Sequence, residues 1–103
     1  MKTEDFNILV NRRVAKTKKV LVVKGAEYTT SDDERFQAFI DGAEVNRCTP
    51  AMYAFALVTK HFLSLRDFVI FREGDITPKI IDDKLGDIIV YMHLLEGILS
   101  EKL

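Results

Sequence analysis

The sequence has one cysteine and two prolines among its 103 residues. The single cysteine, Cys48, excludes an internal disulfide and a cysteine-based zinc site. No apolar run approaches the roughly 20 residues of a membrane span, and the first residues lack the apolar core of a signal peptide. The formal net charge is only −1, so nothing indicates a general binder of nucleic acids or membrane surfaces. Together these absences predict a soluble, cytoplasmic protein.

The composition is that of a globular chain, with 48% hydrophobic and 30% charged residues. The length suits one domain over residues 1–103. A chain of this size buries only about 60–65% of the surface that its unfolded form exposes. Oligomerisation would supplement that burial.

Both prolines follow a threonine, in Thr49-Pro50 and Thr77-Pro78. Threonine at the N-cap followed by proline at the first helical position is a helix-start signal, because that position needs no backbone N–H. We therefore expect one helix from Pro50 to about residue 72 and another from Pro78 toward the C-terminus.

Two further helices are expected in the first half of the chain. Residues 2–24 carry apolar residues at helical spacing. The capping box Ser31…Glu34 predicts a helix that runs through Phe36 and ends near Asn46. The expected fold is all-α, a four-helix bundle with short connections.

The last two helices are apolar around well over half of their circumference. The C-terminal helix has an a/d-like row and a second row beside it: Ile81, Leu85, Ile88, Met92, Leu95 and Leu99, then Ile80, Asp87, Tyr91, Leu94 and Ile98. One flank of each helix can face the internal core, and a second copy of the chain would cover the other. This pattern predicts a homo-oligomer.

Asp83 and Asp87 stand one turn apart at the edge of that second row. An ionised carboxylate on a buried row is costly unless it is paired or bound to a metal, and the two could share a Mg²⁺ ion. The alternative is structural: Asp83 lies near a helix N-terminus, and Asp87 could pair with Lys84 or with another cation.

A polar strip runs along the helix that begins at Pro50, where Lys60, Ser64 and Asp67 share one face. These groups could hold a phosphate and a metal ion. They could equally form an internal Lys60–Asp67 network or a solvated strip. His61 lies beside Leu57 and Leu65, which predicts a partly buried histidine rather than a ligand.

The corner after the first helix gathers charges and an aromatic residue. Tyr28 could stack on a base, and Lys24 or Arg35 could contact phosphates. The same residues could instead form a capping network. The sequence has no glycine-rich phosphate loop, no serine–histidine–acid pattern and no metal-binding His/Cys spacing, so no catalytic residue is assigned.

These segments resemble the nucleotide-modification-associated helical proteins of phages and bacteria and, more distantly, the all-α NTP pyrophosphohydrolase (MazG-like) superfamily. The resemblance covers about residues 20–100 and is carried by four short motifs: Lys24-Gly25-Ala26-Glu27-Tyr28, Asp33-Glu34-Arg35-Phe36, Lys60-His61 with Ser64 and Asp67, and Asp83 with Asp87 and Tyr91. The pyrophosphohydrolases also carry a Glu-Glu-x-x-Glu helix, which this chain lacks. Lys84 occupies the glutamate position of their second acidic motif.

The resemblance implies a nucleotide-binding protein of phage or mobile-element type, acting in the host cytoplasm if it is phage-encoded. Its nucleotide-binding residues would be Lys24, Glu27, Tyr28, Arg35, Lys60 and Ser64, and its Mg²⁺ ligands would be Asp67, Asp83 and Asp87. If it is catalytic, it would hydrolyse an NTP to NMP and pyrophosphate. The alternatives are a non-catalytic oligomer that sequesters a nucleotide or signalling nucleotide, as in counter-defence, and a structural interaction module.

Overall fold

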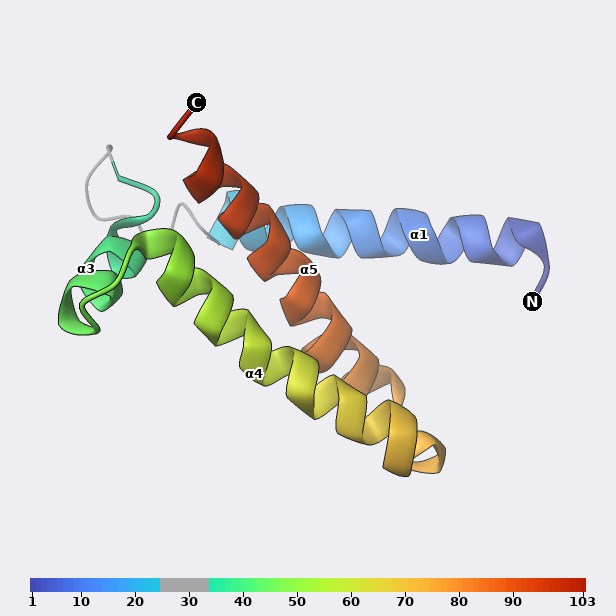
Figure 1. Ribbon diagram of the computed structural model, residues 1–103. Helices are drawn as coiled ribbons and strands as arrows, with labels where there is room; N and C mark the ends of the chain where they lie inside the picture. The colour runs from blue at the N-terminus through green and yellow to red at the C-terminus, as the bar shows by residue number, and fades with distance from the viewer. Residues whose placement is uncertain (25–33) are drawn as a thin grey trace. The chain divides into compact units, whose positions relative to one another are not determined.

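The computed structural model describes residues 1–24 and 34–103, which are helical and contain no β-strand (Figure 1). In chain order the elements are α1 (Thr3–Lys18), the π-helix η1 (Lys19–Lys24), α3 (Gln37–Val45), α4 (Pro50–Phe71), the short 3₁₀ helix η2 (Glu73–Asp75) and α5 (Pro78–Ser100). None of the described helices is long and apolar enough to cross a membrane. The chain divides into two compact units, residues 1–35 and 36–103.

The N-terminal unit is built on α1 and η1. The helix expected over residues 2–24 is present, and its last six residues take the wider π-helical form. Arg35 donates a hydrogen bond from its guanidinium to the carbonyl oxygen of Leu21 at 3.5 Å. The corner residues Glu27 and Tyr28 and the capping serine Ser31 lie outside the described residues.

The two threonine–proline signals start helices where they were expected. Thr49 Oγ1 accepts a hydrogen bond from the backbone N–H of Met52 at 3.1 Å, and Thr77 Oγ1 accepts one from Ile80 at 3.2 Å. Each cap satisfies one of the backbone donors that an α-helix leaves unpaired at its start. The predicted starts of α4 and α5 are therefore confirmed.

The start of α3 differs from the prediction. Glu34 is not helical, residues 35–36 form a turn and α3 begins at Gln37, so the expected helix does not run through Phe36. Phe36 has φ −105° and ψ 18°, and its carbonyl oxygen accepts bonds from the N–H groups of Phe39 and Ile40. The Phe36 ring lies against Gly97 of α5, so close that a Cβ built on this glycine would be 2.6 Å from Phe36 Cζ. This long-range contact accompanies the late start of the helix.

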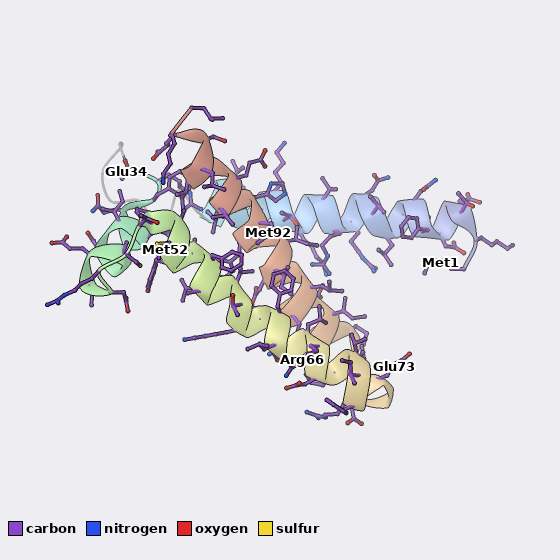
Figure 2. All side chains as sticks on the ribbon, viewed as in Figure 1. Met1, Glu34, Met52, Arg66, Glu73 and Met92 are labelled. Carbon is purple, nitrogen blue, oxygen red and sulfur yellow. The ribbon has the colours of Figure 1, made fainter. Side chains whose placement is uncertain are left out.

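The helices α4 and α5 form an antiparallel hairpin, with α3 at the end of the hairpin away from η2 (Figure 1). Figure 2 shows Arg66 and Glu73 toward the turn and Met52 toward α3. The buried apolar residues of the C-terminal unit are few and mostly small: Ala43, Ala54, Val58, Ile88 and Ile98. Ile98, which belongs to the second apolar row of the C-terminal helix, is thus a core residue.

The hairpin has two different flanks, one on each side of this buried stripe. Successive residues are about 100° apart around a helix, so residues three or four positions apart share a face. On one side lie Tyr53, Lys60, Ser64 and Asp67 of α4 with Asp83 and Asp87 of α5, here named the polar face. On the other lie Phe55, Phe62 and Val69 of α4 with Ile81, Leu85, Met92 and Leu99 of α5, here named the apolar face.

Aromatic contacts hold α3 against the hairpin on the side of the polar face. Phe39 of α3 makes edge-to-face contacts with Tyr53 at 6.3 Å and with Tyr91 at 6.4 Å between ring centroids. Such pairs contribute about 0.5–1.5 kcal/mol each beyond the area that they bury. The Tyr53 ring also lies directly against Gly42, where an added Cβ would overlap its Cε2 and Cζ atoms.

Replacing Gly42 with alanine should destabilise the fold. The Tyr53 ring also makes an edge-to-face contact with Phe39, so moving away from a new methyl group would disturb that contact. We expect a loss of about 1–3 kcal/mol in the free energy of unfolding, measured by urea denaturation.

Gly74→Ala is the matched control, because nothing lies within 4 Å of the corresponding Cβ position. An unchanged or higher stability of Gly42→Ala would show that α3 is not fastened through this contact.

Candidate functional site

Two of the candidate motifs, one on α4 and one on α5, meet at His61. Its Nδ1 lies 3.8 Å from Asp87 Oδ2, which is within ion-pair distance when the imidazole is protonated. The His61 and Tyr91 rings are 5.3 Å apart between centroids and tilted by 35°. The motif around Lys60 thus meets the motif around Asp87 across the hairpin, although more than twenty residues separate them in the sequence.

His61 is half-buried, with 28% of its side chain exposed, as its flanking leucines predict. Its direct contact with Asp87 was not anticipated, because Lys84 or another strong base was the expected partner. Periodicity places His61 on the inner side of α4 but cannot give the axial register of α5 against it. The one signal in the sequence was that His61 and Asp87 each lie beside an apolar row of their own helix.

Asp87 itself is more exposed than its place beside an apolar row suggested. Its side chain is 53% exposed, so water can hydrate the carboxylate, with His61 Nδ1 3.8 Å away. The burial cost that would have demanded a metal or a strong cation is therefore small.

The other two acids each have a neighbouring cation. Lys79 Nζ donates to Asp83 Oδ2 at 2.8 Å, one turn away on α5, and this hydrogen bond and the charge of Asp83 raise the pKa of Lys79. Asp67 Oδ1 accepts from Arg66 Nη2 at 3.0 Å. The partner of Asp67 is thus Arg66 and not Lys60, so the Lys60–Asp67 network proposed from the sequence is not formed.

The Mg²⁺ assignment to Asp67, Asp83 and Asp87 finds no assembled site in the part of the chain that the structure describes. Within residues 1–24 and 34–103, no three His, Cys, Asp or Glu side chains are grouped closely enough to hold a metal ion. Glu27, a further acid of the corner motif, lies outside those residues. The metal assignment stays a prediction.

Among the predicted nucleotide-binding residues, Lys60 is exposed and Ser64 is half-buried, both on the polar face. Lys24 is the last residue of η1, and Arg35 ends the N-terminal unit beside Leu21. Tyr28 lies outside the described residues. The structure thus groups Lys60 and Ser64 with Asp67, Asp83 and Asp87 on one hairpin.

Tyr91, whose ring lies against His61, also has a perturbed acid–base equilibrium. Burial raises the pKa of Tyr91 above its usual value, and the charge of Asp87 and the Tyr53 phenol raise it further. Because the folded state holds the phenolic proton more tightly than the unfolded state, this group's contribution to stability is complete below about pH 10. It is lost as the pH rises through the pKa of Tyr91 in the folded state.

Asp87→Asn should lower the pKa of Tyr91 toward the ordinary tyrosine range, because it removes the carboxylate charge and leaves the burial in place. Spectrophotometric titration of tyrosinate absorbance measures this, with Tyr91→Phe identifying which transition belongs to Tyr91. Asp75→Asn is the control, since Asp75 pairs with Arg72 at the turn. A titration that Asp87→Asn leaves unaltered would contradict the placement of Asp87 beside Tyr91.

Comparisons with known proteins add no relative: no protein family, curated protein or solved structure matches this chain. The resemblance to the nucleotide-modification-associated proteins rests on the motif residues.

Proposed function

We propose that this protein binds a nucleotide on the polar face of the α4–α5 hairpin. Lys60 and Ser64 would contact the phosphates, and the rings of His61 and Tyr91 would form the floor of the site. The proposal includes the phage or mobile-element origin that the resemblance implies and assembly as a homo-oligomer.

The observation that carries this proposal is the meeting of two distant motifs at His61. The pair His61–Asp87 at 3.8 Å joins the Lys60-His61 motif to the Asp87…Tyr91 motif on one surface. Two helices could pack equally well with apolar residues at these positions. A partly exposed imidazole and carboxylate instead offer a hydrogen-bond donor and acceptors to a polar ligand.

The polar face carries both a cation that can attract phosphate and carboxylates that can attract a metal ion. The Lys60 ammonium attracts phosphate as a compact point charge, and the Ser64 hydroxyl can donate a hydrogen bond to it. Asp83 and Asp87 would repel phosphate oxygens unless a cation lies between them. A nucleotide carrying Mg²⁺ would relieve that repulsion, and the metal would compete with Lys79 for Asp83.

The second candidate is metal-independent sequestration of a nucleotide or a signalling nucleotide. It is favoured by the ion pairs of Asp67 with Arg66 and of Asp83 with Lys79, which already neutralise two of the three acids. Pyrophosphohydrolase activity has less support, because the chain lacks the Glu-Glu-x-x-Glu motif of that superfamily.

Binding is tested by thermal shift with nucleoside mono-, di- and triphosphates and cyclic nucleotides, each with Mg²⁺ and with EDTA. A ligand at a hundred times its Kd should stabilise the fold by about 2.7 kcal/mol. A Mg²⁺-dependent shift supports the first candidate and leads to a pyrophosphate-release assay. A shift that persists in EDTA supports sequestration, and no shift with any nucleotide would refute the proposed function.

Lys60→Ala should weaken the affinity of the best ligand by about tenfold or more, because it removes a charge-assisted contact to phosphate. Isothermal titration calorimetry measures the affinity. Lys102→Ala is the matched control, since Lys102 is exposed in the turn after α5. Equal affinities of the two variants would place the phosphates elsewhere.

A further inference from the structure

The apolar face lies on the opposite side of the hairpin from the polar face, and no other part of the C-terminal unit buries it. Its seven residues are between 37% and 60% exposed, with Phe55 the most exposed and Met92 the least. They come from both long helices and extend over most of the hairpin's length.

The area of this face is close to what a dimer interface needs. A fully exposed large side chain presents about 200 Å², so these fractions amount to on the order of 600 Å² of apolar surface. The largest apolar patch of an ordinary monomer is roughly 300–600 Å². A standard interface buries about 800 Å² per partner, of which about 65% is apolar in homodimers.

The face also has the composition of a self-complementary surface. None of its seven residues is charged or polar, while the charged residues Arg66 and Glu96 lie at its edges. A two-fold interface brings the same patch of both subunits together, so a patch with charges of one sign at its centre would repel itself. An apolar centre with a charged rim avoids that repulsion.

We infer that the apolar face is a homodimer interface, on which the α4–α5 hairpin of one copy packs against the same hairpin of a second copy. Four long helices then enclose a core that neither chain forms alone. The two polar faces point away from this interface, so each would keep its own open surface. This inference gives a surface to the homo-oligomer included in the proposed function, but it does not rest on nucleotide binding, because the interface needs no ligand.

The test is the molar mass of the ligand-free protein by sedimentation equilibrium, for the wild type and for Phe62→Glu. Phe62 lies between Phe55 and Val69 on the α4 side of the apolar face. A carboxylate buried there in a dimer would be unpaired. We expect a dimer, or an even multiple of it, for the wild type and monomers for Phe62→Glu. His93→Glu is the control, because His93 is exposed on α5 outside this face, and it should keep the wild-type mass.

A dimer with a micromolar Kd would be almost fully assembled at a protein concentration of about 100 μM. A wild-type protein that is still monomeric at that concentration would overturn the inference, whatever the variants do. So would an oligomer that keeps its mass in Phe62→Glu, since another surface would then hold it together. If Phe62→Glu is unfolded by circular dichroism, the milder Leu85→Gln replaces it, with the same outcomes.

Discussion

The narrow contact between α4 and α5 is the constraint on which the rest of the C-terminal unit depends. Its buried centre consists of Ala54, Val58 and Ile88, with Ile98 farther along α5. Small side chains at the centre let the two helices approach closely, and they also keep the buried stripe narrow. A narrow stripe leaves both flanks of the hairpin at the surface. The polarity of each flank then decides which kind of ligand or partner it can bind.

The two flanks differ because each helix distributes its side chains unevenly around the buried stripe. The flank with Lys60 and Asp87 joins exposed charges to a half-buried imidazole, while the opposite flank is apolar over its whole length. The α3 helix supports the polar side, through the Phe39 contacts with Tyr53 and Tyr91. One side is thus suited to a polar ligand and the other to another apolar surface.

Local chemistry in the sequence predicted the helix starts at Pro50 and Pro78, because a threonine cap acts within its own four residues. The start of α3 was not predictable in this way, since it goes with the packing of Phe36 against Gly97, sixty-one residues away. A capping box describes only its own turn and carries no information on such a contact.

The candidate site was predictable in composition but not in pairing. Spacing alone placed Lys60, Ser64 and Asp67 on one strip and Asp83 near Asp87. Which acidic side chain pairs with which basic one depends on the rotation and axial register of the two helices. It also depends on pairs within one helix, such as Arg66–Asp67 and Lys79–Asp83, which compete with pairs between helices. The His61–Asp87 contact could therefore emerge only from the three-dimensional structure.

Nucleotide binding on the polar face can be followed residue by residue. The measurement is of the amide chemical shifts of the ¹⁵N-labelled protein during titration with the four nucleoside triphosphates, with and without Mg²⁺. We expect shift changes at Lys60, His61, Asp87 and Tyr91, and none at Val69 or Leu99, which lie on the apolar face away from these residues. Changes confined to the apolar face or to the N-terminal unit would contradict binding on the polar face.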